Sequence, residues 1–126
     1  MRKGICGLLV GAGLFAGTAD AALAADAAEG QKLFMKYCVA CHDLTPKNKL
    51  GPNLTGIVGR TSGTVEGFKY SEALKKAAIS WNDETLDKYL ADPRNFVIGN
   101  EMGRAFLGVK KEDERENVIA YIKSRK

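Results

Sequence analysis

The feature that most constrains this chain is the segment Cys38-Val39-Ala40-Cys41-His42, a C-x-x-C-H motif. It contains the single histidine of the 126-residue chain and two of its three cysteines. A single histidine excludes every site that needs two imidazoles from one chain, such as an H-E-x-x-H zinc protease or a bis-histidine haem. Any fold proposed for this chain has to account for the chemistry of these five residues.

The first 24 residues have the pattern of a secretory signal. Met1-Arg2-Lys3 is a short basic start, and residues 4–19 form an uncharged, mostly apolar run of 16 residues. Because a membrane-spanning helix needs about 20 apolar residues, we interpret this run as the hydrophobic region of a cleaved signal. Ala22-Leu23-Ala24 supplies an A-x-A site, which predicts a signal peptide over 1–24 and a mature domain over 25–126.

Removal of this segment changes the cysteine and charge balance. It takes Cys6, and it takes two basic residues and one acidic residue, so the net charge falls from +4 to +3. Export predicts an oxidising periplasm, in which stray thiols would pair. The two remaining cysteines, three positions apart, therefore need a chemical explanation. An uncleaved anchor and cleavage beside Ala21 or Ala25 are the alternatives that the pattern leaves open.

Covalent haem attachment explains the motif best. Two thiols at this spacing can add to the two vinyl groups of a haem, and the next residue presents its imidazole to the iron. A structural zinc ion needs four ligands, a thioredoxin-like pair needs a βαβ context, and a disulfide here would close a tiny loop and stabilise little. We predict one haem c, attached through Cys38 and Cys41, with His42 as an iron ligand.

Helical periodicity indicates four short helices in the mature chain, and no convincing alternating strand is present. Each helix combines a polar capping residue with apolar residues at intervals of three or four. The expected helices are 27–37 after the capping-box pair Asp26 and Glu29, 72–78 after Ser71, a helix opened by Asn82 and ended by Pro93, and a final helix after the capping-box pair Asp113 and Glu116.

The remainder is loop, and eight of the nine glycines in 25–126 lie between Gly51 and Gly108. Long loops are unusual in a compact domain, and a chain of about 100 residues buries only a limited core. A large apolar cofactor resolves both difficulties, because it supplies the buried surface that the helices lack. The expected fold is all-α, with three to five short helices and long loops wrapped around one covalently attached haem.

The second axial ligand has to be something other than histidine. The mature chain has two methionines, Met35 and Met102. Met35 lies on the expected first helix, three residues before Cys38, and so on the same side as the attachment turn. Met102 lies sixty residues past His42, in a loop whose neighbours form no core stripe. We predict that Met102 is the ligand opposite His42.

Read in order, the mature chain resembles the class I cytochromes c, in particular the small soluble bacterial ones similar to mitochondrial cytochrome c. The resemblance covers essentially the whole of 25–126. The segments that carry it are Gly30 and Phe34 with Val118 and Tyr121, Gly51-Pro52-Asn53-Leu54 with Gly56 and Gly59-Arg60, Gly67-Phe68-Lys69-Tyr70-Ser71 with Trp81, Leu86 with Tyr89-Leu90 and Pro93, and Glu114-Arg115 through Lys123.

The resemblance implies roles for several of these residues. It implies that the carbonyl of Pro52 accepts the Nδ1–H of His42, which fixes the tautomer of the imidazole. It also places Tyr89 near the sulfur of Met102. The residues that it assigns to the buried haem propionates are Arg60, Tyr70 and Trp81.

The loop around Met102 departs from the family pattern. Two extra residues follow Met102, and the charge beside it is negative where redox partners usually meet a positive one. The substituted positions are Ile98 in place of the usual proline, Asn100 in place of a hydroxyl residue, Glu101 in place of lysine and, outside the loop, Leu74 where asparagine is common.

These expectations describe an electron carrier and not an enzyme, because His42 and Met102 leave no position on the iron for a substrate and Met/His ligation raises its potential. The implied partners are a cytochrome bc complex, a terminal oxidase, a reaction centre or a dehydrogenase. We expect a periplasmic monomer without a membrane span after cleavage and without a nucleic-acid partner. The lysines that could surround the haem edge are Lys32, Lys36, Lys47, Lys49, Lys110 and Lys111.

Two other functions remain open. If the altered loop leaves Met102 off the iron, the sixth position is free and the chain is a small-ligand-binding or peroxidatic haem protein. A thiol–disulfide oxidoreductase is the third hypothesis, and it fails if haem stays on the protein through acid–acetone extraction.

Overall fold

Helices supply the regular structure that the periodicity indicates. The computed structural model describes residues 13 and 24–126, and in that part the chain is all-α apart from an isolated bridge between Thr61 and Ser80. This confirms the predicted fold class. The helices are α1 (Ala27–Tyr37), α2 (Glu72–Ala77), α3 (Asp83–Ala91), α4 (Pro93–Phe96), α5 (Met102–Ala105) and α6 (Glu112–Ser124).

The predicted signal peptide, with Cys6 and the apolar run, lies outside the described residues except for Gly13 and Ala24. Its assignment to 1–24 and that of the mature domain to 25–126 therefore stay predictions. Among the helices of the described part, none has the length and apolar character that crossing a membrane requires.

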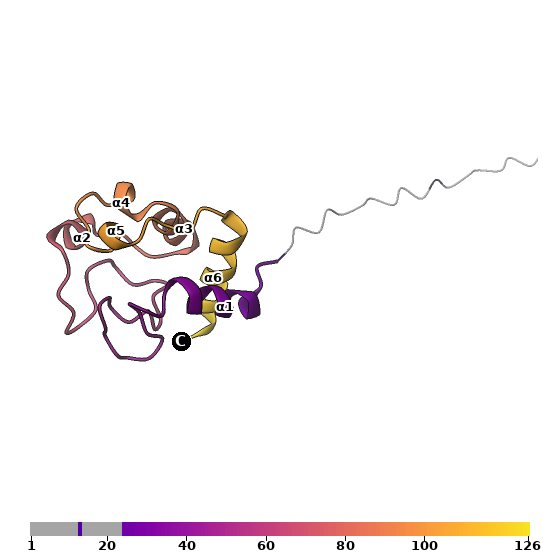
Figure 1. Cartoon of the computed structure of the whole chain (residues 1–126), viewed down its shortest axis with the longest axis horizontal. Helices are drawn as coiled ribbons and strands as arrows, with labels where there is room; N and C mark the ends of the chain where they lie inside the picture. The colour runs from indigo at the N-terminus through magenta and orange to yellow at the C-terminus, as the bar shows by residue number, and fades with distance from the viewer. Residues whose placement is uncertain (1–12, 14–23) are drawn as a thin grey trace, which may run out of the picture.

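The described domain has three parts (Figure 1). The crossed pair α1 and α6 joins the two ends of the domain. The short helices α2, α3, α4 and α5 form a second group, and the long loop that follows α1 lies across from them. This loop holds the C-x-x-C-H motif at its start. The arrangement places the motif on one side of the domain and Met102, the first residue of α5, on the other.

The crossing of α1 and α6 depends on a glycine. A Cβ added to Gly30 would lie 1.9 Å from the backbone oxygen of Asn117, so the two backbones touch at this point. Beside it, Phe34 and Tyr121 pack edge to face with ring centroids 5.6 Å apart. The buried residues of α1 are Gly30, Leu33 and Phe34, which recur at intervals of three and four.

We expect Gly30→Ala to destabilise the domain, although alanine is the better helix former by about 1 kcal/mol. The methyl group has no room against Asn117, so the helices must separate, and such overpacking typically costs about 1–3 kcal/mol, occasionally more. Because the helix propensity of alanine offsets part of this cost, the free energy of unfolding in denaturant should fall by about 1–2 kcal/mol. The control is Gln31→Ala at the exposed neighbouring position, and a Gly30→Ala protein as stable as this control would contradict the close crossing.

The α1–α6 contact also changes how the helices are capped. The side chain of Asp26 accepts from the amides of Ala28 and Glu29, which confirms it as an N-cap. Its own backbone N–H, which a capping box would give to Glu29, instead donates to Oδ1 of Asn117 at 2.7 Å. The predicted capping box at the last helix is wrong. Helix α6 begins at Glu112, one residue before Asp113, and has no side-chain cap, although its first turn is acidic.

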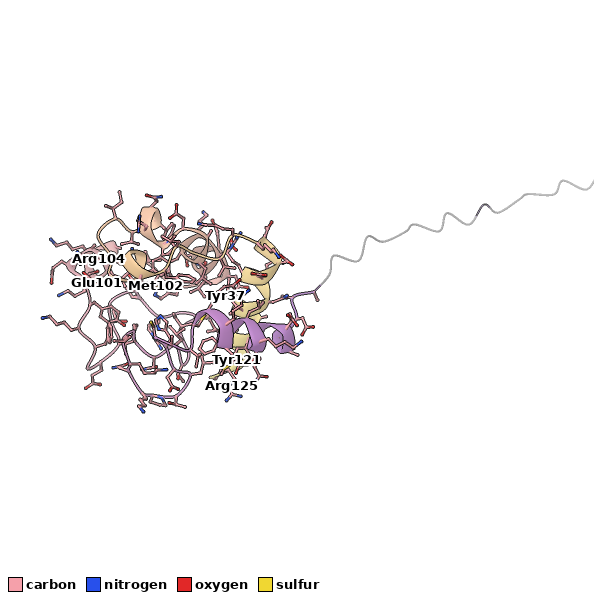
Figure 2. All side chains as sticks on the ribbon, viewed as in Figure 1. Tyr37, Glu101, Met102, Arg104, Tyr121 and Arg125 are labelled. Atoms are coloured by element: carbon pink, nitrogen blue, oxygen red, sulfur yellow. The ribbon has the colours of Figure 1, made fainter. Side chains whose placement is uncertain are left out.

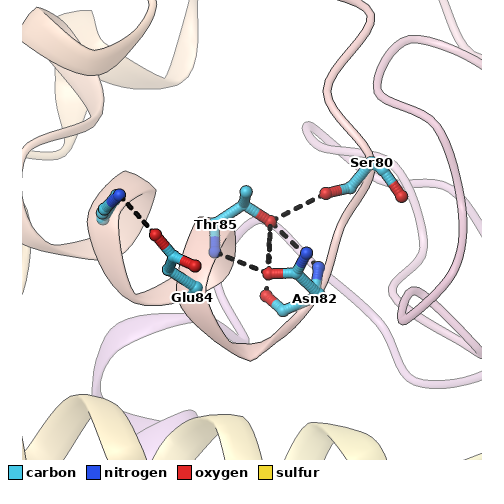
Figure 3. A network of polar contacts seen from close by, with 5 residues as sticks. Ser80, Asn82, Glu84 and Thr85 are labelled. Atoms are coloured by element: carbon cyan, nitrogen blue, oxygen red, sulfur yellow. Dashed lines mark hydrogen bonds and ion pairs between the residues drawn. The ribbon is translucent and has the colours of Figure 1, made fainter.

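A full capping box forms instead at α3 (Figure 3). The Oδ1 of Asn82 accepts from the amide of Thr85, and the Thr85 hydroxyl oxygen accepts from the amide of Asn82, both at 2.9 Å. The Thr85 hydroxyl also donates to the carbonyl of Ser80 at 2.8 Å. One turn on, Lys88 pairs with Glu84 at 2.6 Å. These bonds fix the start of the helix that carries Tyr89.

An ion pair joins α3 to α6. The Nε of Arg115, on the buried face of α6, lies 2.6 Å from Oδ1 of Asp87. Its Nη1 donates to the carbonyls of Val109 and Lys110, each at 3.0 Å. Arg115 therefore joins the segment after α5, at Val109 and Lys110, to Asp87 on α3. This fixes the C-terminal end of the stretch between α3 and α6 that contains Met102.

Candidate functional site

The C-x-x-C-H motif forms a turn that continues α1. The amides of Cys41 and His42 donate to the carbonyl of Cys38 at 3.1 and 2.9 Å, so the motif residues lie on one helical turn. Both thiols are free. Burial, with a smaller contribution from Cys41, raises the pKa of the Cys38 thiol to about 12. A thiol–disulfide oxidoreductase needs a reactive thiolate, and burial disfavours the thiolate of Cys38, so Cys38 is not suited to that role.

The imidazole of His42 is buried and oriented by one hydrogen bond. Its Nδ1 lies 2.8 Å from the carbonyl oxygen of Pro52, the partner that the resemblance implies. A carbonyl only accepts, so Nδ1 carries the proton and Nε2 keeps its lone pair for a metal. Burial lowers the pKa of His42 more than the Pro52 bond raises it, and the charge of Lys49 lowers it further. The ring is therefore neutral, as an iron ligand must be.

Close backbone approach explains the glycine before this proline. A Cβ on Gly51 would lie 2.3 Å from Cε1 of the His42 ring. The amide of Gly51 donates to the carbonyl of Cys41 at 2.7 Å, which holds the loop against the motif. Any side chain at this position would push the imidazole out of place. The Gly51-Pro52 pair therefore orients His42 in two ways: Gly51 leaves room for the ring, and the carbonyl of Pro52 accepts the hydrogen bond from Nδ1.

The predicted propionate residues lie on neighbouring segments. The amide of Trp81 donates to the carbonyl of Arg60 at 2.9 Å, which joins these two residues through their backbones. The guanidinium of Arg60 donates through Nη1 to the carbonyl of Asn53 at 2.8 Å and through Nη2 to that of Thr55. The loop next to Pro52 is thus tied to Arg60.

The two aromatic members of this set differ in environment. The Tyr70 hydroxyl oxygen accepts from the amide of Val65 at 3.1 Å, so its own O–H is available to donate to another group. Burial raises the pKa of this phenol, which keeps that proton in place. Trp81 is buried, and its ring centroid lies 5.1 Å from that of Tyr89. Trp81 and Tyr89 thus form part of the apolar core, as aromatic residues beside a cofactor commonly do.

Met102 opens α5 and is labelled in Figure 2 with its neighbours Glu101 and Arg104. Its side chain is half-buried and packs against the apolar core. Tyr89, which the sequence placed beside the Met102 sulfur, is buried on α3, but its hydroxyl donates to Oδ1 of Asn100 at 2.9 Å. Asn100 is the residue that sequence reasoning missed as part of the site, since it was noted there only as a departure from the family pattern.

The residues present fit a covalently attached haem. Two free thiols lie on one turn, and the adjacent neutral imidazole keeps Nε2 for the iron. The backbone of Gly51 lies directly against that ring, where a single Cβ would clash, and so holds it in a fixed orientation. Within 24–126 and at residue 13, no group of three or more His, Cys, Asp or Glu side chains is placed to hold a metal ion.

Comparison with known proteins agrees with this donor set. Residues 27–126 match the profile of the Cytochrome c family. The chain is 47% identical to cytochrome c2 of Blastochloris viridis over 125 residues, which are 98% of this chain and 93% of the relative. It is 46% identical to cytochrome c of Chlamydomonas reinhardtii, over 79% of this chain and 89% of the relative. It is 47% identical to cytochrome c of Euglena viridis, over 80% and 98%.

Proposed function

This chain belongs to the cytochrome c family, and on that premise we propose that it carries single electrons between redox partners in the periplasm, with His42 and Met102 as the axial ligands of its haem. Family membership establishes an electron carrier and not an enzyme, and it implies one haem c attached through the C-x-x-C-H cysteines. The iron of that haem supplies the one-electron couple. The proposal adds the sixth ligand, the compartment and the kind of partner.

The observation that carries the proposal is the hydrogen bond from His42 to Pro52. It leaves Nε2 as the ring nitrogen with a lone pair for the iron, and it makes the imidazole a stronger ligand. The side chains around His42 and Met102 then hold these two residues in the same position in the ferric and the ferrous protein. Little has to rearrange when an electron arrives or leaves. Arg60, Tyr70 and Trp81 are the proposed propionate partners.

The periplasmic location rests on the predicted signal peptide. The similarity to the Blastochloris viridis protein spans 125 residues, so it extends beyond 25–126 into the predicted signal. The relative thus shares part of that segment, and cleavage after Ala24 stays a prediction. The proposed partners are a cytochrome bc complex, a terminal oxidase, a reaction centre or a dehydrogenase, met by a monomeric carrier.

Carbon monoxide distinguishes the electron carrier from the ligand-binding alternative. The holoprotein is matured with a haem-attachment system, reduced and mixed with carbon monoxide. If Met102 fills the sixth position, the ferrous spectrum stays low-spin and carbon monoxide binds only as fast as the methionine leaves. Rapid binding and a high-spin ferric spectrum would instead assign the chain to small-ligand or peroxidatic chemistry.

The six lysines expected near the haem edge are all exposed, but several are already engaged. Lys32 pairs with Glu29 at 2.9 Å, and Lys111 with Glu114 at 3.5 Å. The Nζ of Lys110 donates to the carbonyls of Ala91 and Leu107 at 2.9 and 2.7 Å. With a net charge of only +3 after cleavage, electrostatic steering should be present but moderate.

We therefore expect the rate of reduction by a purified cytochrome bc complex to decline several-fold as the ionic strength rises from about 0.01 to 0.15 M, because the screening length falls from about 30 to 8 Å. Lys111→Gln should reduce this dependence. The matched control is Lys75→Gln on α2, where the lysine is likewise paired with a glutamate, Glu72, at 2.5 Å. A rate that does not change with salt would exclude steering by these lysines.

A further inference from the structure

The segment that carries Met102 is held by one buried side chain, Asn100. We propose that Asn100 is the positioning residue of the distal ligand: it fixes the backbone on both sides of Met102 and retains the Tyr89 hydroxyl that would otherwise be free to donate to the sulfur. This inference rests on the proposed ligation by Met102. It concerns how the chain keeps that ligand in place without the proline that the family usually has in this loop.

All the hydrogen-bonding capacity of the Asn100 side chain is used. Its Nδ2 donates to the carbonyl of Pro93 at 2.7 Å and to that of Val97 at 2.6 Å. Its Oδ1 accepts from the Tyr89 hydroxyl and from the amide of Gly103, each at 2.9 Å. Only 3% of the residue is exposed. An amide has two donor hydrogens and two acceptor lone pairs, so no further bond is possible.

These four bonds join separate parts of the distal segment. Tyr89 lies on α3, Pro93 begins α4, Val97 is the C-cap of α4, and Gly103 directly follows Met102. Met102 therefore lies between Asn100, the centre of the network, and one of its partners. Loss of the network would remove a restraint from the backbone on both sides of the ligand together.

Gly103 is restrained a second time. A Cβ there would lie 2.7 Å from the Cα of Arg94 and 3.0 Å from Nδ2 of Asn100, so α5 packs directly on α4. The Nε of Arg94 also donates to the carbonyl of Gly103 at 3.0 Å. The position after Met102 is thus fixed by one bond to its amide and one to its carbonyl.

The stretch before Asn100 is closed through the backbone, where the amide of Asn100 donates to the carbonyl of Val97 at 3.1 Å. Ile98 is 82% exposed, and Gly99 adopts a positive φ of 91°, a conformation that glycine reaches without strain. Proline at position 98 would stiffen the loop by fixing φ, and isoleucine does not. The buried amide of Asn100 provides that stiffness through side-chain hydrogen bonds instead.

The bond from Tyr89 has a separate consequence for the ligand. Burial raises the pKa of Tyr89 to about 12, so the hydroxyl keeps its proton at neutral pH. A hydroxyl has one hydrogen to donate, and here it goes to Asn100. With that hydrogen given to Asn100, the Tyr89 hydroxyl does not donate to the Met102 sulfur.

Competition by imidazole tests this proposal. Free imidazole can occupy the sixth position of the ferric holoprotein only after Met102 has left, so its apparent affinity reports how firmly Met102 is held. Asn100→Ala leaves the Tyr89 hydroxyl and the Gly103 amide without their buried partner, and such unsatisfied groups are costly. We expect the apparent association constant for imidazole to rise roughly tenfold or more.

The matched control is Asn82→Ala, the same substitution at the cap of α3 shown in Figure 3. It should lower the midpoint of global unfolding and leave imidazole affinity unchanged, because it lies at the far end of α3 from Tyr89. Asn100→Thr, which restores the hydroxyl type usual in the family, is the second variant and should give a smaller rise than alanine. It also carries the test if the alanine variant does not fold.

Two failures can be told apart. If the wild-type ferric protein has no sulfur-to-iron charge-transfer band, Met102 is not the ligand and the proposed function itself is wrong. If that band is present and imidazole binds the Asn100 variants no more tightly than the wild type, the ligation holds and the positioning role of Asn100 is overturned. A rise of the same size in Asn82→Ala also overturns it, since affinity would then follow global stability.

Discussion

Replacing both Cys38 and Cys41 with alanine is expected to leave no haem on the chain after acid–acetone extraction and to prevent the domain from holding its native fold. Between Cys38 and Ser71 the buried apolar side chains are Cys38 and Ile57 alone. A loop of this length, with so little core of its own, depends on a bound apolar group. Either single variant should keep one thioether and therefore some attached haem.

The third cysteine provides the control for this experiment. Cys6 lies in the predicted signal peptide, so Cys6→Ala should yield mature protein with a normal haem content. The haem content is read from the spectrum of the extracted polypeptide, and the fold from far-ultraviolet circular dichroism. Haem that is removed by acid–acetone from the wild type would show that the attachment is not covalent.

Met102→Ala should keep the haem attached and lower its reduction potential markedly. A thioether favours ferrous iron, whereas water or hydroxide in its place favours ferric iron, so loss of the sulfur stabilises the oxidised form. Each tenfold change in that preference shifts a one-electron potential by about 59 mV. We expect a fall of several such steps, within the span of about 0.8 V that axial ligands cover.

Met35→Ala is the matched control, since Met35 is the other methionine of the mature chain. It lies on α1 with 59% of its surface exposed, and its replacement should leave the potential unchanged. Potentiometric titration of the two variants beside the wild type gives the comparison. A Met102→Ala protein with the wild-type potential would mean that another group occupies the sixth position.

Local signals predicted the helices well where a nearby side chain caps the first turn. The first helix has the predicted bounds, and Ser71 and Asn82 cap α2 and α3 as expected. The start of α6 was predicted two residues late because Asp113 has the pattern of a cap but lies within the first turn, and the N-cap is Lys111. Helices α4 and α5 were not predicted. Each has four residues, too few for a periodic pattern, and tertiary contacts fix them.

The site divides in the same way. The proximal half could be predicted because its chemistry lies in five consecutive residues and a nearby Gly-Pro pair. The distal half could not, because the partners of Asn100 lie 3, 7 and 11 residues away and meet only when α3, α4 and α5 pack. The bond from the Tyr89 hydroxyl to Asn100 was not predicted for this reason, and the expected proximity of Tyr89 to the Met102 sulfur stays a prediction. An asparagine after a glycine gives no sequence signal of such burial.

The absorption spectrum of the mature ferric holoprotein tests the central claim most directly. With His42 and Met102 on the iron, the spectrum is low-spin and contains a sulfur-to-iron charge-transfer band, and that band is absent from Met102→Ala and retained in Met35→Ala. A high-spin ferric spectrum without the band in the wild type would contradict the account, because the iron would then lack its sulfur ligand and be open to small molecules.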